Sequence, residues 1–349
     1  MGTNLTTQGI TKSGPATGNS VVKGSLGSDF ITVYGWGNTI YGHGGNDTVN
    51  AGAGNTTIYV GPGQSIINLS GWNNTIIGKD PTVTGSLGNT TLILGTANNV
   101  IDIAGWSNSI EVGNGNNRIQ AGDGNEQVTV GGGNNVVRFG GYGNALAGGN
   151  GNNTVSGSTG NSTVSLGDGR NAVSLGGCGN SISIGNGSDR IDAGTGVDTV
   201  TAGAGKDTIT LHGYANKVTL NGTTASVFGG DGADTIAVNG GQVRLALPGN
   251  GETVLLSNAA SASIADLSPR LMLGTDGSAV AISIADFNPA SQAVIDLTGA
   301  TPYHVPHDIV AALQADGHGG TVLDLGGGGV LTLAHINPAA LHNWNFQLG

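Results

Sequence analysis

Three consecutive nine-residue blocks between Gly185 and Leu211 decide the fold. They read Gly185-Asn186-Gly187-Ser188-Asp189-Arg190-Ile191-Asp192-Ala193, Gly194-Thr195-Gly196-Val197-Asp198-Thr199-Val200-Thr201-Ala202 and Gly203-Ala204-Gly205-Lys206-Asp207-Thr208-Ile209-Thr210-Leu211. Each block has a glycine-rich turn, a polar residue and a short strand of alternating character. The apolar residue after the turn points inward and its neighbours point outward. Two blocks therefore make one coil of about 18 residues, and stacked coils pair in parallel roughly 4.8 Å apart.

The same pattern runs from about Gly24 to Leu247, or roughly twelve coils. Inward Val, Ile and Leu side chains form a thin continuous core, and glycines occupy turn positions that need positive φ. The pattern predicts an all-β protein, a right-handed parallel β-solenoid of the β-roll type with a small C-terminal capping segment. We divide the chain into a polar N-terminal segment (1–23), Gly/Asn-rich solenoid repeats (24–256) and a C-terminal segment (257–349).

Composition supports a repeat fold over the other glycine-rich classes. The chain has 349 residues, of which 67 are Gly, and only 9% are charged. Collagen needs Gly at every third position, which is absent here. Disorder goes with low hydrophobicity and high net charge, whereas Val, Ile and Leu recur regularly in this chain. A solenoid is the class that remains.

Charge and apolar runs exclude several partners and locations. The formal net charge is −11 and the eleven basic residues are scattered, which argues against nucleic acid. The sequence has no run of about 18 apolar residues, so no membrane insertion is expected. Cys178 is the single cysteine, so there is no disulfide framework. Residues Met1 to Ser20 show no secretory signal, which leaves either the cytoplasm or export read from the C-terminus.

A second period of two coils places an aromatic residue, or once a cysteine, in the same turn position. Its successive spacings are 36, 34, 36, 36 and 36 residues. Its members are Trp36, Trp72, Trp106, Tyr142, Cys178 and Tyr214. We expect a column along one solenoid edge with members about 9.6 Å apart. The column is interpreted either as a turn filler that stiffens the edge, or as a strip for sugar stacking or self-association.

One block resembles the calcium-binding nonapeptide repeat of the RTX proteins, whose motif is GGxGxDxUx with U a large apolar residue. The stretch Gly229-Gly230-Asp231-Gly232-Ala233-Asp234-Thr235-Ile236-Ala237 matches this motif fully. The resemblance implies a β-roll that binds Ca²⁺ between turns of successive coils, through the Asp carboxylate and turn carbonyl oxygens. Such hard oxygen ligands suit Ca²⁺. The implied calcium ligands are Asp29, Asp47, Asp189, Asp198, Asp207 and Asp234.

The Asp position is not filled by Asp throughout. Asp29 and Asp47 are 18 residues apart, as are Asp189 and Asp207, whereas Asp198 and Asp234 are separated by Asn216. Elsewhere the position holds Asn117, Asn135, Asn171, Thr56 or Glu126. We therefore expect residues 52 to 180 to be largely metal-free, with asparagine ladders along the turns. The proposed ladder residues are Asn55, Asn89, Asn108, Asn125, Asn144, Asn161 and Asn180. The alternative role for the Asp residues is simple turn capping by Asx hydrogen bonds.

After about Ser257 the glycine period stops. Asp308 is predicted to cap a short helix over Ile309 to Ala315 that ends at Gly317, followed by strands at Thr321–Leu325 and Val330–Ala334. The Asp-Phe-Asn-Pro run at 286–289 and the Val-Ile-Asp-Leu run at 294–297 are similar to the C-terminal segments of type I secreted proteins. The resemblance implies that 257–349 is a secretion segment, and the segment must also cap the last coil.

The sequence contains none of the common hydrolase, zinc-protease or phosphate-loop motifs, so we expect no enzyme. The first functional hypothesis is a secreted, calcium-binding structural protein that self-assembles into an extracellular filament, surface layer or biofilm matrix. Its partner is then a second copy of the chain. The second is a carbohydrate-binding adhesin that stacks an extracellular polysaccharide on the aromatic column. The third is an ice-binding protein, suggested by the threonine pairs at 199/201 and 208/210.

Overall fold

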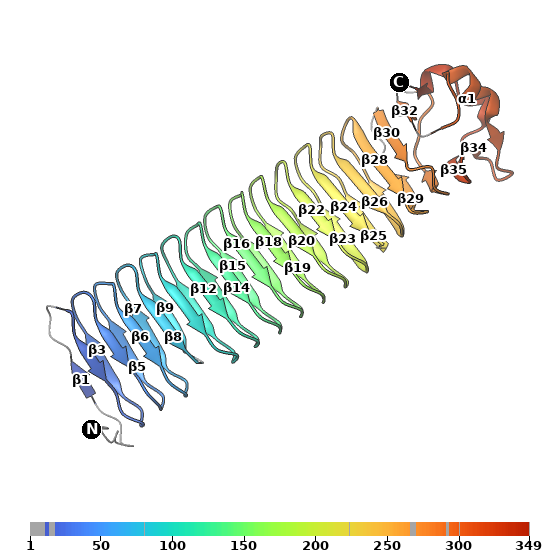
Figure 1. Cartoon of the computed structure of the whole chain (residues 1–349). Helices are drawn as coiled ribbons and strands as arrows, with labels where there is room; N and C mark the ends of the chain where they lie inside the picture. Colours follow the sequence, from blue (N-terminus) through green and yellow to red (C-terminus); the bar gives the residue numbers. More distant parts are fainter. Residues whose placement is uncertain are drawn as a thin grey trace. The chain divides into compact units, whose positions relative to one another are not determined.

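The computed structural model describes residues 11–13, 18–79, 81–222, 224–265, 270–290, 293–299 and 301–348. The chain forms two compact units, Met1–Leu175 and Gly176–Gly349. Each unit is built of stacked coils, with one strand of each coil in sheet A and one in sheet B (Figure 1). The prediction of an all-β parallel solenoid is confirmed.

In the first unit, strands pair in parallel with the strand one coil further along. In sheet A, Val100 pairs with Arg118, and in sheet B, Ser109 pairs with Gln127. Sheet A contains β1 (Thr11–Ser13), β3 (Phe30–Val33), β5 (Thr48–Ala51), β7 (Ile66–Leu69), β9 (Thr82–Gly85), β11 (Val100–Ile103), β13 (Arg118–Ala121), β15 (Val136–Phe139), β17 (Thr154–Gly157) and β19 (Ala172–Leu175). Sheet B contains β2 (Val21–Lys23), β4 (Thr39–Tyr41), β6 (Thr57–Val60), β8 (Thr75–Gly78), β10 (Thr91–Leu94), β12 (Ser109–Val112), β14 (Gln127–Val130), β16 (Ala145–Gly148) and β18 (Thr163–Leu166).

The core of the first unit is a stack of β-branched and leucine side chains. The second residue of each four-residue strand is almost fully buried, as in β12, where Ile110 is buried between exposed Ser109 and Glu111. Burying such a side chain contributes about 1.5–3 kcal/mol. Because the period of the pattern is two, a slip of one residue would expose this whole stack, and the alternation fixes the register.

Two regions of the first unit bear on the predictions. The coil at Gly78–Gly85 is shorter than its neighbours, since Ile66 pairs with Thr82 and Thr75 pairs with Thr91. This is a two-residue deletion within a continuous sheet, and it accounts for the single 34-residue spacing, between Trp72 and Trp106. In the polar N-terminal segment, β1 pairs in parallel with β3 and extends sheet A.

The second unit begins with the same architecture. Its sheet B contains β20 (Ser181–Ile184), β22 (Thr199–Ala202), β24 (Lys217–Asn221), β26 (Thr235–Asn239), β28 (Glu252–Ser257), β30 (Arg270–Thr275), β32 (Val294–Asp296) and β36 (Phe346–Gln347). Its sheet A contains β21 (Arg190–Asp192), β23 (Lys206–Thr210), β25 (Thr224–Phe228), β27 (Gln242–Ala246), β29 (Ser261–Ala265), β31 (Ala281–Ile284), β35 (Gly329–Leu333), β34 (Thr321–Gly326) and β33 (Gln314–Ala315).

Parallel pairing continues after the glycine period stops. Strand β28 pairs with β30 and β30 with β32, while β29 pairs with β31. Leu271, Leu273 and Ile295 remain buried in these coils. The alternation of apolar residues therefore keeps the strands in register without the glycine period. The division of the chain at residues 23 and 256 stays a prediction.

The C-terminal segment covers the last coils. Strands β34 and β35 form an antiparallel hairpin whose second strand pairs in parallel with β31, which confirms both predicted strand segments. The helix prediction was wrong in its bounds, since α1 spans Pro306–Ala312 and lacks a side-chain cap. Pro306 begins the helix because its fixed φ suits the first helical position. Gly317, with φ of 77°, lies in the turn between β33 and β34.

Two short 3₁₀ turns complete the segment, η1 (Pro338–Ala340) and η2 (Asn343–Asn345). The buried Asn345 donates its side-chain N–H to the carbonyl of Pro289 at 3.1 Å, which fastens the end of the chain to the coils. In the described ranges no helix is both long enough and apolar enough to cross a membrane.

Candidate functional site

Each strand is preceded by a turn whose last residue, here called the slot residue, points into the solenoid. The slot residues before sheet A strands include Asp29, Asp47, Ser65, Asn99, Asn117, Asn135, Asn153, Asn171 and Asp189, and Asp207 takes the same position as the second residue of β23. Those before sheet B strands include Asn38, Thr56, Asn74, Thr90, Asn108, Glu126, Asn144, Ser162, Asn180, Asp198, Asn216 and Asp234, and Glu252 takes the same position as the first residue of β28. All of these side chains are buried although they are polar. All six predicted Asp residues occupy slots.

The slot residues form an inner ladder of hydrogen bonds with one direction. The backbone N–H of a slot residue donates to the side-chain oxygen of the slot residue 18 positions later. Asn117 N donates to Asn135 Oδ1 at 3.2 Å, and Asn135 N donates to Asn153 Oδ1 at 3.3 Å. Each asparagine amide also donates to turn carbonyls, as Asn135 Nδ2 does to Gly133 O at 3.2 Å. The ladder thus satisfies buried turn groups without an ion.

An outer ladder runs beside the inner one and in the opposite direction. The residue before a sheet A slot is exposed, and its N–H bonds to the side chain 18 positions earlier. Asn134 N donates to Asn116 Oδ1 and Asn152 N donates to Asn134 Oδ1, at 2.8 and 3.0 Å. In each Asn-Asn pair, one side chain therefore points in and the other out.

The predicted asparagine ladder proves to contain two kinds of residue. Asn108, Asn144 and Asn180 belong to the inner ladder. The others are exposed turn residues with φ between 49° and 53°, namely Asn55, Asn89, Asn125 and Asn161. Asparagine suits this left-handed conformation better than most residues. Their prediction as ladder residues was wrong, because backbone conformation, which the pattern does not reveal, decides which asparagine turns inward.

In the first unit, Asp29 and Asp47 occupy adjacent slots. Asp29 N donates to Asp47 Oδ1 at 2.9 Å. The two oxygens of Asp29 accept hydrogen bonds from the backbone and hydroxyl of Ser25, both at 2.6 Å. Burial, with a smaller contribution from the nearby charge of Asp29, raises the pKa of Asp47 to about 6. The turn-capping role of Asp29 is therefore present, while the Asp47 carboxyl favours neutralisation by a proton or a cation.

The second unit holds the longer acidic series. Asp189 N donates to Asp207 Oδ1 at 3.0 Å in sheet A slots. In sheet B slots, Asp198, Asn216, Asp234 and Glu252 follow one another, and Asp234 N donates to Glu252 Oε2 at 2.8 Å. Glu252 was missed in the sequence analysis, although it lies 18 residues after Asp234 and closes the Gly249-Asn250-Gly251-Glu252 turn.

Oxygen atoms converge where the fully matching turn meets the turn of the next coil. A Cβ placed on Gly249 would collide with Glu252 Oε1 and with the carbonyl oxygen of Gly232, and would lie 3.0 Å from that of Gly230. A Cβ on Gly229 would lie 3.1 Å from Leu247 Cδ2 and 3.3 Å from Asp234 Oδ2. Gly249 thus leaves a position lined by carboxylate and carbonyl oxygens, which a side chain would fill.

Two carboxylate oxygens in these slots are left unsatisfied. Among the described residues, Asp198 Oδ2 and Glu252 Oε1 are buried and accept no hydrogen bond. Burial raises the pKa of Glu252 to about 8, and the charge of Asp234 adds to this effect. Burial likewise raises the pKa of Asp198. A buried carboxylate without a partner costs several kcal/mol, so these turns favour a cation.

The donor set fits Ca²⁺. It offers carboxylate oxygens from adjacent slots and backbone carbonyl oxygens, the hard ligands that Ca²⁺ takes in numbers of six to eight. Within the described ranges no group of three or more His, Cys, Asp or Glu side chains is gathered around one point. A Ca²⁺ ion would therefore be held by two carboxylates together with carbonyls and water. Asp234 and Glu252, with the carbonyls of Gly230 and Gly232, are the residues that would hold it.

The aromatic residues of the 36-residue period lie in a column along one edge, where they alternate with glycine. Bridges run from Gly54 to Trp72, Gly88, Trp106, Gly124 and Tyr142 in succession. In the first unit the aromatic side chains are about half exposed: Trp36 54%, Trp72 45%, Trp106 54% and Tyr142 52%. In the second unit Cys178 and Tyr214 are also exposed, and their neighbours Gly196 and Gly232 would clash if they bore a Cβ. The column predicted from the 36-residue period is therefore present in each unit.

The threonine pairs considered for ice binding do not form one array. Thr199 and Thr201 lie on β22 in sheet B, whereas Thr208 and Thr210 lie on β23 in sheet A. A flat ice-binding surface would need both pairs on the same sheet, so these four residues do not provide one.

A family model describing four copies of the RTX calcium-binding nonapeptide repeat matches residues 37–65, 107–137, 147–177, 183–213 and 226–244. The chain is an RTX-repeat protein. Neither the curated proteins nor the solved structures contain a match to this RTX-repeat protein. Its repeats are calcium-binding, which agrees with the oxygen-lined turns of the second unit. RTX-repeat proteins are typically secreted, and their β-roll is typically structural and not catalytic.

Proposed function

We propose that this RTX-repeat protein is an extracellular structural protein that self-assembles into a filament, surface layer or matrix. The observation that carries the proposal is the aromatic column of the first unit. Four large aromatic side chains along one edge are about half exposed, in a chain with only 4% aromatic residues. Aligned exposed apolar groups of this kind mark contact surfaces.

Burial of the column between two copies would supply the free energy of assembly. An aromatic side chain contributes 150–250 Å² when buried, at about 25 cal/mol per Å². Four residues half-exposed in each copy therefore offer roughly 10 kcal/mol per copy before the entropy of association is subtracted. The low charge of the chain, with 9% charged residues, adds little repulsion between copies.

Calcium binding would make the stability of the folded chain, and so its assembly, depend on the Ca²⁺ concentration of the compartment. Bound Ca²⁺ supplies the positive charge that lets buried slot carboxylates ionise. Where Ca²⁺ is scarce, no cation offsets the free-energy cost of burying the carboxylates of the acidic turns. The folded chain is then less stable, which suits export of the unfolded chain through a narrow channel. Where Ca²⁺ is abundant, at a hundred times its Kd, the folded state gains about 2.7 kcal/mol per site. Export would use residues 257–349 as the secretion segment.

Electron microscopy and analytical ultracentrifugation of the full chain, in millimolar Ca²⁺ and in chelator, test the proposal. Ordered polymers in Ca²⁺ are expected for the wild type, and their loss is expected for the double variant Trp72→Ala/Trp106→Ala. Trp344→Ala is the matched control, since Trp344 is 62% exposed in the C-terminal segment. Monomers of the wild type in both conditions would sink the proposal.

A second candidate function, carbohydrate adhesion, draws on the same column. Its rings lie two coils apart, about 9.6 Å, which is close to the length of an extended disaccharide. In that case Trp72→Ala would abolish retention on insoluble glycans while leaving the sedimentation of the protein unchanged. Loss of assembly without loss of glycan retention would instead favour the structural role.

A further inference from the structure

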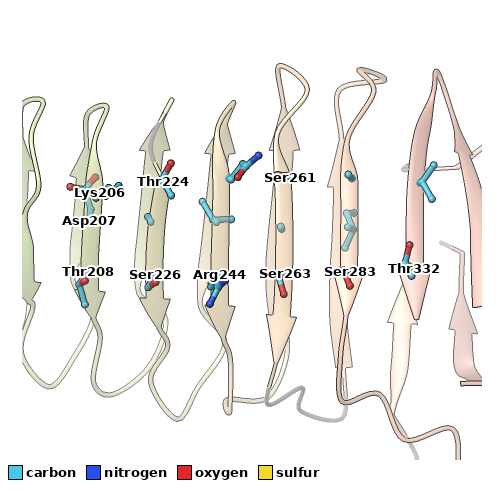
Figure 2. A pocket seen from close by; sticks show the side chains of 17 residues that line it. Lys206, Asp207, Thr208, Thr224, Ser226, Arg244, Ser261, Ser263, Ser283 and Thr332 are labelled. Carbon is cyan, nitrogen blue, oxygen red and sulfur yellow. The ribbon is translucent and has the colours of Figure 1, made fainter. Parts of the chain in front are cut away.

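The outer face of sheet A in the second unit carries a groove of about 710 Å³ that the calcium turns and the aromatic column do not use. The groove crosses β23, β25, β27, β29, β31 and β35, so it runs perpendicular to six parallel strands (Figure 2). Neighbouring strands lie about 4.8 Å apart, so the groove is roughly 24 Å long. It is open along this direction, a shape that suits an extended polymer.

The side chains that line the groove stand in register. One residue from each strand forms a central row, because strand pairing places each opposite the next. This row consists of Thr208, Ser226, Arg244, Ser263, Ser283 and Thr332. Figure 2 shows the row as a line of hydroxyl groups interrupted by Arg244. Beside it, Lys206, Thr224, Gln242 and Ser261 form a second polar row.

The cations of this face have no acidic partner within the described part of the chain. Lys206 and Arg244 are exposed and form no ion pair, and Arg190, in register with Thr208, extends the central row that contains Arg244. By contrast, Arg270 at the other sheet is paired with Asp296 at 2.7 Å. In a chain of net charge −11, two cations without an ion pair in one polar groove are a local reversal of charge.

The carboxylates near this face do not cancel that reversal. Asp207 lines the groove but is buried in its slot. Asp192 lies on β21, outside the residues that line the groove, and contacts His212 at 3.1 Å. Asp324 lies opposite Val330, beyond the last strand of the groove. The middle of the groove is therefore positive, and its concave shape concentrates that potential.

We propose that this groove binds an acidic polysaccharide, a glycan chain bearing carboxylates, laid across the strands. The guanidinium of Arg244 offers two parallel N–H donors that match a carboxylate. The hydroxyls of Ser226 and Ser263, on either side of it, exchange hydrogen bonds with sugar hydroxyls. Each coil advances by about 4.8 Å, close to one sugar residue of an extended glycan, so successive strands face successive sugars.

The charge spacing sets the expected pattern of the glycan. Lys206 on β23 and Arg244 on β27 are two strands apart, about 9.6 Å along the groove. They would contact carboxylates on alternate sugar residues, while the intervening strand offers Thr224 and Ser226 as hydrogen-bonding groups. This site is separate from the self-assembly surface, so either can fail without the other.

Isothermal titration of the full chain with oligogalacturonates of about six residues, matched to six strands, tests the proposal. A fixed low Ca²⁺ concentration avoids gelling of the ligand. Arg244→Gln and Lys206→Gln are each expected to weaken binding about tenfold, since each removes a charge-assisted contact. Lys217→Gln, on the opposite sheet at β24, is the matched control and keeps wild-type affinity.

Two further titrations distinguish a site for a glycan chain from non-specific attraction of anions. The carboxyl-reduced oligosaccharide and the galacturonate monomer should both bind at least tenfold more weakly than the oligomer, and added salt should weaken oligomer binding. Wild-type affinity in both groove variants, equal affinity for the reduced oligosaccharide or the monomer, or no binding of the oligomer would each overturn the proposal. Sedimentation of Arg244→Gln in Ca²⁺ should match the wild type, which keeps the outcome independent of self-assembly.

Discussion

Replacing Glu126 by Gln should remove a pH dependence from the stability of the first unit. Glu126 is fully buried in the inner ladder, where Oε2 accepts the N–H of Asn108 at 3.0 Å and its own N–H donates to Asn144 Oδ1 at 3.2 Å. Burial, with a smaller contribution from the charge of Asp123, raises its pKa from 4.5 to about 7. Gln keeps the shape and the accepting oxygen but does not ionise.

The sign of the effect follows from proton linkage. Because the folded state holds the proton more tightly than the unfolded state, the folded chain binds more protons between pH 4.5 and about 7. The stabilisation is complete below pH 4.5 and is lost as the pH rises through 7. At about 1.4 kcal/mol per pKa unit, the loss reaches at most about 3 kcal/mol. Glu126→Gln should match the wild type at pH 5 and exceed it in stability at pH 8.

Urea denaturation of both proteins at pH 5 and pH 8, with chelator present, measures this difference. The free energy of unfolding of the wild type should fall between the two pH values by up to about 3 kcal/mol more than that of the variant. Glu111→Gln, an exposed change on β12 in the same unit, controls for the loss of a charge. Equal pH slopes in wild type and Glu126→Gln would refute the assignment of a proton to the buried carboxyl.

Three further outcomes are expected. Glu252→Gln should reduce the Ca²⁺-induced rise in Tm by weakening one site. Gly249→Ala should reduce this rise too, because the new methyl group occupies the space between the ligand oxygens. Differential scanning calorimetry with Ca²⁺ and with chelator checks both variants. Asn135→Ala should cost about 1–3 kcal/mol in denaturant unfolding by orphaning buried ladder groups, whereas the exposed neighbour change Asn134→Ala should cost less than about 0.5 kcal/mol. Ile110→Ala should cost about 2–5 kcal/mol by the same assay and Ile110→Val about 1 kcal/mol, and equal costs would contradict a packed core at that position.

The repeat made most of the fold predictable. Gly-X-Gly turns followed by alternating strands fix an inward residue every nine positions, so the blocks at 185–211 predicted both the strands and their parallel pairing. The pairing of Asp189 with Asp207, and of Asp29 with Asp47, followed from the same spacing. Local pattern and tertiary contact coincide in a solenoid because each coil contacts only its neighbours.

The remaining features depended on information that the nine-residue period does not contain. Glu252 was not predicted because it lies after Leu247, where the recognisable glycine pattern ends, although its carboxylate occupies the same slot. The helix began at Pro306 and not after Asp308, since a proline at the first helical position outweighed a side-chain cap. The groove was invisible in the sequence because the hairpin of β34 and β35 brings Thr332 beside Ser283. The proximity of these two residues follows only from the folded structure.

The inner ladder makes each unit directional. A buried slot N–H is satisfied by a side chain 18 residues further on, as from Asn117 to Asn135, so removal of a C-terminal coil orphans a buried donor at the new end. Removal of an N-terminal coil orphans strand N–H groups as well as the exposed outer-ladder donors, since Val136 N donates to Asn117 O at 2.8 Å. A coil inside the array therefore becomes fully bonded only when both of its neighbours along the chain are in place.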